Sequence, residues 1–196
     1  VTPEYLRLLC QAGETLQKVK QLDLSNNGLG DAEIELLSKS RCLPKLEKLF
    51  LNHNKISDSG AKILAESKLV QNISCLMLEA NQIGVNGAQS LATSLNLKNL
   101  ETLFLDSNPI GPEGAEALAR STCLPSLTAL HMDSTGIGDQ GVKAIAASQT
   151  LSKIKKLYLC SNKIGDEGAI ALSQSPNLSH LTCLSIWRNE IRDEIG

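Results

Sequence analysis

The sequence predicts an α/β solenoid, in which stacked repeats place a parallel sheet on one side and helices on the other. Asparagine recurs with a 27-residue period, and only Thr135 interrupts the series. Each interval contains one stretch with alternating apolar residues and a second with helical apolar spacing. A fixed period of this length indicates a stacked repeat array, in which function usually lies on one face. The asparagines are Asn27, Asn54, Asn81, Asn108, Asn162 and Asn189.

The repeat frame divides the chain into units of equal length. Each asparagine closes the pattern apolar-x-x-Leu-x-apolar-x-x-Asn-x-apolar, so repeats begin at positions 19, 46, 73, 100, 127, 154 and 181. Residues 3–13 align with the helical half of a preceding unit, which makes residues 1–18 a partial repeat. The last repeat is truncated, with Ile195 and Gly196 in place of the usual Gly-Ala. We therefore expect residues 1–196 to form a single repeat domain excised from a longer protein, because terminal repeats normally carry a polar cap.

Each repeat predicts a strand followed by a helix. Leu103 and Leu105 alternate with polar positions, which is typical of a strand buried on one side. Ala115, Leu118 and Ala119 then stand at i, i+3 and i+4, as on the buried side of a helix. A strand–helix–strand order makes neighbouring strands parallel.

Recurring polar and small residues are predicted to hold the stack together. Each asparagine amide is expected to point inward and bond the backbone of its own and the next turn. Thr135 can replace only part of that network, so residues 133–138 are a predicted weak point. One aspartate column, interrupted by Pro112, is expected to cap helix N-termini. That column contains Asp31, Asp58, Asp139 and Asp166.

A glycine column and a serine column are also interpreted as structural. The glycines indicate close approach of neighbouring helices, and six recurring serines indicate buried hydroxyls rather than nucleophiles. The glycines are Gly60, Gly87, Gly114, Gly141 and Gly168. The serines are Ser40, Ser67, Ser94, Ser121, Ser148 and Ser175.

Composition restricts the function classes. The net charge is -2 and the pI is about 6.0, which gives no basic surface for nucleic acid or an anionic membrane. No apolar run approaches the roughly 20 residues needed to cross a bilayer. Cysteines that share a column, such as Cys75 and Cys183, lie four repeats apart, about 19 Å, which is too far for a disulfide. We therefore predict free thiols, a cytoplasmic location, and a monomer unless the uncapped ends associate.

The repeat resembles the ribonuclease-inhibitor-like class of leucine-rich repeat. The strand frame is followed by Ile-Gly-Asp-x-Gly-Ala-x-x-Leu-Ala, as in residues 164–172, and the likeness covers about residues 16–196. The chain departs from the usual family unit, because its own unit is slightly shorter and uniform in length. The resemblance implies a right-handed solenoid, a horseshoe arc with a concave parallel sheet and convex helices. It also implies a protein-binding scaffold.

Four of the five aromatic residues fall in two columns predicted to face outward from the sheet. One column contains a continuous series across five strands, which we call the aromatic line: Phe50, Met77, Phe104, His131 and Tyr158. Cross-strand contact alone would explain such a series. We favour a partner-binding surface, because exposed contiguous apolar surface usually marks an interaction site. Trp187 lies in the second column and is assigned to the same surface.

Three carboxylates, Glu79, Asp106 and Asp133, occupy consecutive repeats of that second column. We call them the acidic line. The acidic line is either a solvated surface or a site for a partner's Lys or Arg, and both interpretations are open. The second fits a partner that also places an apolar side chain on the neighbouring aromatic line.

Catalysis is not expected. His53, His131 and His180 are scattered, the glycines recur at structural positions, and nothing predicts a metal, cofactor or nucleophile site. We therefore predict a non-catalytic scaffold that binds a partner protein on its concave face. The alternative is a regulatory segment of a larger protein: an innate immune receptor, a bacterial effector or ubiquitin-ligase component, or a Ran-type GTPase-activating protein. Ribonuclease inhibition is disfavoured by the modest negative charge.

Overall fold

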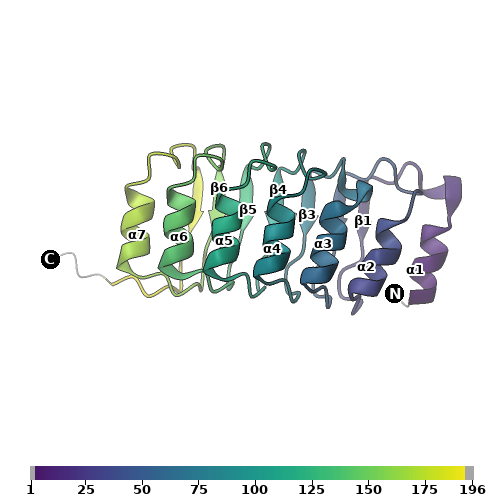
Figure 1. Ribbon diagram of the computed structural model, residues 1–196, viewed down its shortest axis with the longest axis horizontal. Coiled ribbons are helices and arrows are strands. Elements are labelled where there is room, and N and C mark those ends of the chain that lie inside the picture. The colour runs from purple at the N-terminus through teal and green to yellow at the C-terminus, as the bar shows by residue number, and fades with distance from the viewer. Residues whose placement is uncertain (1–2, 193–196) are drawn as a thin grey trace.

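The computed structural model describes residues 3–192 and shows one parallel sheet covered on one side by a row of helices (Figure 1). The sheet has seven strands in the order β1 to β7. The strands are β1 (Gln21–Asp23), β2 (Lys48–Phe50), β3 (Cys75–Met77), β4 (Thr102–Phe104), β5 (Ala129–His131), β6 (Lys156–Tyr158) and β7 (Cys183–Ser185). The predicted α/β solenoid is confirmed. Ile195 and Gly196 lie outside the described residues.

One helix precedes the first strand, and one follows each strand from β1 to β6. The helices are α1 (Pro3–Cys10), α2 (Asp31–Ser38), α3 (Asp58–Glu66), α4 (Val85–Ala92), α5 (Gly111–Ala119), α6 (Gly138–Ala146) and α7 (Asp166–Ser173). Two short 3₁₀ helices, η1 (Gly13–Leu16) and η2 (Lys68–Val70), complete the described elements. In the part of the chain that the structure describes, the helices are too short and polar to cross a membrane.

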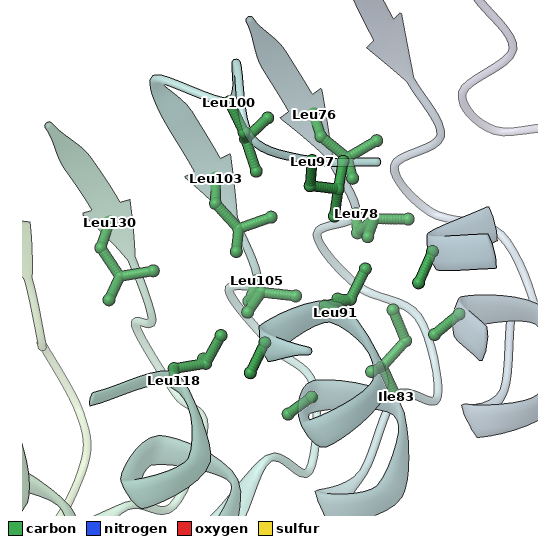
Figure 2. Close-up of a cluster of buried hydrophobic side chains, with 14 of the residues drawn as sticks. Leu76, Leu78, Ile83, Leu91, Leu97, Leu100, Leu103, Leu105, Leu118 and Leu130 are labelled. Atoms are coloured by element: carbon green, nitrogen blue, oxygen red, sulfur yellow. The ribbon is translucent and has the colours of Figure 1, made fainter. Parts of the chain in front are cut away.

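Strand register follows the repeat period. Leu49 pairs with Leu76, and Leu76 pairs with Leu103. These central residues are fully buried. Figure 2 shows Leu76 and Leu103 pointing toward the helices, in one apolar cluster with Leu91 of α4. Because side chains alternate along a strand, the residues flanking each central leucine point to the other side. We call that other side, which the helix row leaves uncovered, the open face.

The asparagine ladder connects each repeat to the preceding repeat rather than to the next one. The Asn108 amide donates to Leu78 O at 2.8 Å and to Leu105 O at 3.0 Å. Its carbonyl oxygen accepts the Ile83 N–H at 3.0 Å. The predicted ladder is correct, but its predicted direction was wrong, because the turn that the amide reaches belongs to the repeat before it.

Thr135 alters this ladder at one junction. Its hydroxyl donates to Met132 O at 2.7 Å and to the Asn162 side-chain oxygen at 3.1 Å. One repeat earlier, the Ile83 N–H donates to a ladder asparagine. The equivalent Ile110 N–H donates instead to Asn108 O, at 2.8 Å. The change therefore lies in the turn before Thr135 as well as around it.

Two aspartates of the column, Asp58 and Asp139, cap the following helix and not the helix that contains them. Asp58 is the first residue of α3, yet its Oδ1 accepts the N–H of Gly84 at 2.6 Å and of Gly87 at 2.9 Å. Those two amides open α4. Asp139 bonds Gly165 and Gly168 in the same way, at 2.7 and 2.9 Å. Each carboxylate thus stabilises a helix N-terminus and links two repeats.

Helices α5 and α6 begin differently, because Val85 and Pro112 occupy the aspartate position before them. Gly111 and Gly138 adopt φ of +67° and +56°. Their N–H groups donate to Thr135 O at 3.0 Å and Asn162 O at 3.1 Å. Glycine adopts positive φ without a steric penalty, so a backbone bond replaces the missing carboxylate.

The glycine and serine columns are structural, as predicted. A Cβ on Gly87 would lie 2.6 Å from Ile83 Cγ2 and 2.7 Å from Asp58 Oδ1, so the helices approach too closely for any side chain. The Ser121 hydroxyl is buried and donates to Ala92 O of the preceding repeat. Ser94 and Ser148 make the equivalent bonds. All six cysteines are free thiols.

Candidate functional site

The aromatic line lies across five neighbouring strands of the open face, as predicted. Phe50 pairs with Met77, Met77 with Phe104, Phe104 with His131, and His131 with Tyr158. Three of these rings are stacked. The Phe104 and His131 centroids are 3.9 Å apart, and those of His131 and Tyr158 are 4.1 Å apart. The cross-strand contact is therefore real, and the side chains remain half-buried rather than covered.

His131 is held neutral by its place in this stack. Burial between the neighbouring rings lowers its pKa from 6.5 to about 4. The nearby Asp133 acts against this shift, whereas Lys156 adds to it. At neutral pH the imidazole is therefore an uncharged member of an apolar ridge.

The acidic line has an internal role that the sequence did not indicate. Asp106 Oδ1 accepts the Asp133 N–H at 2.7 Å, and Asp133 Oδ1 accepts the Cys160 N–H at 2.6 Å. Asn52 makes the equivalent bond to the Glu79 N–H at 3.1 Å. Asn52, Asp106 and Asp133 thus each bond the backbone amide of the next repeat, which explains two of the three carboxylates of the acidic line without a partner.

Asp106 is the perturbed carboxylate of this group. Burial raises its pKa from 3.8 to about 7, and the negative charges of Asp133 and Glu79 add to the rise. The hydrogen bond from the Asp133 N–H opposes it. At neutral pH Asp106 is therefore close to half protonated, and the formal charge of the acidic line overstates its actual charge.

Trp187 lies in the same row as the acidic line, two residues beyond β7. It is 57% exposed, and the Arg188 guanidinium carbon lies 4.4 Å above its ring. Cys160 separates it from Asp133 along the row and is buried, with its Sγ 3.0 Å from Ser185 Oγ. Trp187 is therefore a separate aromatic group rather than a member of the stack.

A third row on the open face was missed at the sequence level. Cys75, Thr102 and Ala129 precede Met77, Phe104 and His131 by two residues, and together with the aromatic line they line a hollow of about 470 Å³. We call it the sheet hollow. Lys48 and Lys156 line its two ends, and Glu101 also contributes to its lining. The signal that could have revealed it was three consecutive small residues between two lysines in one column.

The described residues show no arrangement typical of a metal centre. Between residues 3 and 192, no three His, Cys, Asp or Glu side chains are grouped so that they could hold a metal ion. The perturbed groups His131 and Asp106 lie on an open, shallow surface. Their arrangement supports binding more directly than chemistry.

Comparison with known families supports the repeat assignment. Residues 17–62 match the family described as "Leucine Rich repeats (2 copies)". Residues 96–119, 123–146 and 150–173 match the family described as "Leucine Rich repeat". The chain is built of leucine-rich repeats. A comparison of this leucine-rich-repeat chain with curated proteins returned no match.

A solved structure shares the fold. The leucine-rich-repeat chain is similar to an internalin from Listeria monocytogenes, with 22% sequence identity and a TM-score of 0.52. The match covers 92% of this chain and 58% of the internalin chain, so this chain spans somewhat more than half of that protein's length. At this identity the likeness concerns the solenoid fold only.

Proposed function

We propose that this leucine-rich-repeat chain is a non-catalytic scaffold that binds a partner protein on its open face. The observation that carries the proposal is the uncovered aromatic line, in which Phe104, His131 and Tyr158 stack while remaining half-buried. Leucine-rich repeats are generally protein-interaction modules. Aromatic and Met side chains are enriched at interfaces, and neutral His131 adds no charge that binding would have to desolvate.

The proposed binding residues divide into an anchor and a rim. Aromatic side chains near the centre of an interface usually carry most of its binding energy, whereas surrounding charges determine orientation and specificity. We assign the anchor to the aromatic line and the rim to the acidic line and Trp187. The proposed binding residues are Phe50, Met77, Phe104, His131, Tyr158, Trp187, Glu79, Asp106 and Asp133.

We also propose the ribonuclease-inhibitor-like subtype and a cytoplasmic location. The subtype is supported by helices of eight or nine residues after the strands β1 to β6. The location is supported by the six free thiols. The same open face would serve a free-standing scaffold or the sensing segment of a larger protein.

The test is affinity capture with the chain as bait and a matched pair of variants. Phe104→Ala combined with Tyr158→Ala removes both ends of the stack and should reduce capture of the native partner at least tenfold. Leu95→Ala is the control, because Leu95 is 81% exposed but lies just after α4, away from the strands of the open face. Circular dichroism should show an unchanged fold for both. Unimpaired capture by the double variant would refute the assignment.

A further inference from the structure

The open face has three parallel rows with different chemistry. The aromatic line is central. The row that runs from Lys48 to Lys156 lies on the side where the strands begin, and this row and the aromatic line together line the sheet hollow. The acidic line lies on the side where the strands end. Neighbouring rows are about 6.6 Å apart, because residues two apart on a strand face the same side.

Charges of opposite sign therefore flank the same apolar ridge. The pKa of His131 is affected by both charges. Burial is the main cause of its lowering, but Asp133 raises this pKa and Lys156 lowers it. At the other end of the hollow, Lys48 acts on the Cys75 thiol, opposing the pKa rise that burial causes. The two lysines are exposed and take no part in the ion pairs that connect described residues.

Building on the proposed function, we propose that the open face binds an amphipathic α-helix of the partner protein, lying across the strands along the aromatic line. Its apolar stripe contacts the aromatic line. One flank carries basic residues that meet Glu79 and Asp133, and the other carries acidic residues that meet Lys48 and Lys156.

The spacing of the sheet favours a helix over an extended segment. A helix advances 5.4 Å per turn, close to the strand separation of about 4.8 Å, so successive turns lie over successive strands. The aromatic line spans about 19 Å, which corresponds to about 13 helical residues. An extended segment places alternate side chains toward and away from the sheet, and therefore has no lateral flanks for two rows of charge. Pairing with a sheet edge would place a peptide beside β1 or β7, not over the central strands.

The sheet hollow provides room on the acidic flank of such a helix. Its lining includes the aromatic line and, between the two lysines, the small residues Cys75, Thr102 and Ala129. Glu101 is the unfavourable group here, because it lines the same hollow and repels acidic residues. Glu101→Gln should therefore strengthen helix binding, by about two- to fivefold.

The test uses synthetic helical peptides that share one leucine stripe and are just long enough to cover the aromatic line. One has a lysine flank and a glutamate flank, a second has two lysine flanks, and a third has two glutamate flanks. A fourth repeats the first with two central prolines, which prevent the helix. Fluorescence anisotropy measures the Kd of each peptide for the whole chain. We expect the mixed peptide to bind at least tenfold more tightly than the other three.

Charge reversal makes the test specific. In the variant Lys48→Glu with Lys156→Glu, the two-lysine peptide should become the tightest ligand, because both flanking rows are then acidic. The Phe104→Ala/Tyr158→Ala variant should lose all four. Equal binding of the four peptides, no binding at millimolar concentration, or an order unchanged by charge reversal would overturn the helix inference. Capture of the native partner is a separate measurement, so it can succeed while this inference fails.

Discussion

The two sides of the sheet differ in how their residues repeat. On the side covered by helices, each column keeps nearly one residue type: leucine in the strands, asparagine in the turns, serine and glycine at the helices. On the open face, the column of the aromatic line changes from Asp23 through Phe, Met, His and Tyr to Ser185. On the side covered by helices, side chains that bond the backbone of a neighbouring repeat keep their residue type with few exceptions, as the asparagines do. The column of the aromatic line varies more, which indicates that stacking constrains these positions less and leaves them free to serve a partner.

The largest effect on stability is expected from the asparagine ladder. Asn108→Ala removes the acceptor of the buried Ile83 N–H and the side-chain donor to the Leu105 carbonyl, so the free energy of unfolding should fall by about 3 to 4 kcal/mol. Ser107→Ala is the control, because Ser107 is exposed and Ala80 occupies its position one repeat earlier. Urea unfolding followed by circular dichroism measures both. Equal stability of the two variants would contradict the division between the two sides.

A smaller loss is expected at a glycine in the row of helices. Gly87→Ala would place its Cβ 2.6 Å from Ile83 Cγ2, and we expect destabilisation of about 2 kcal/mol. Gly30→Ala is the control, because the nearest heavy atom to its added Cβ is 3.5 Å away. The same unfolding experiment compares them. A Gly87 variant as stable as the Gly30 variant would show that the groups around Gly87, namely Asp58 of α3 and Ile83, can move away from the added Cβ.

Substitutions on the open face should change the pH dependence of stability rather than remove core packing. The pKa of Asp106 is about 7 in the fold and ordinarily 3.8, so its contribution to stability falls as pH rises from about 4 to 7. Asp106→Asn keeps an acceptor for the Asp133 N–H, as Asn52 does for Glu79. Above pH 7 this variant should be more stable than the parent, because it removes a partly buried negative charge. The gain in the free energy of unfolding should be about 1 to 2 kcal/mol, a moderate value because water screens part of that charge.

His131 has the opposite dependence. Its pKa of about 4 in the fold lies below the ordinary 6.5, so stability is lost as pH falls from about 6.5 to 4. His131→Phe should remove this loss while keeping the stack. Unfolding curves between pH 4 and 8 measure both variants. The contributions of Asp106 and His131 to the pH dependence of stability have opposite signs in the parent protein, so each must be measured in its own variant. If stability depended on pH in Asp106→Asn and His131→Phe as it does in the parent, these two pKa shifts would be contradicted.

The smallest effect is expected at the Thr135 junction. The Ile110 N–H bonds Asn108 O within its own turn, whereas the Ile83 N–H bonds a ladder asparagine. Amide exchange at Ile110 and in residues 133–138 should therefore be faster than at Ile83 and in residues 79–84. Equal protection in the two turns would show that the threonine junction is as firm as the others.

What the sequence could predict follows from the same contrast. The strands, the helices and the serine and glycine roles were predictable because each position recurs and each recurrence has one physical explanation. The direction of the Asn108 and Asp58 bonds was not, because either residue can reach its own turn or a neighbouring one, and only stacking decides. The aromatic line was predictable from its register. The sheet hollow was not, because between Lys48 and Lys156 no residue type recurs in consecutive repeats of its column.

The most direct test of the central claim is hydroxyl-radical footprinting of the chain with and without its captured partner. The reactive side chains of Met77, Phe104 and Tyr158 report on the open face, and Tyr5 on α1, 69% exposed, is the control. We predict that the partner lowers oxidation of the three open-face residues several-fold and leaves Tyr5 unchanged. Protection confined to the helices, with Met77, Phe104 and Tyr158 oxidised as before, would contradict the account.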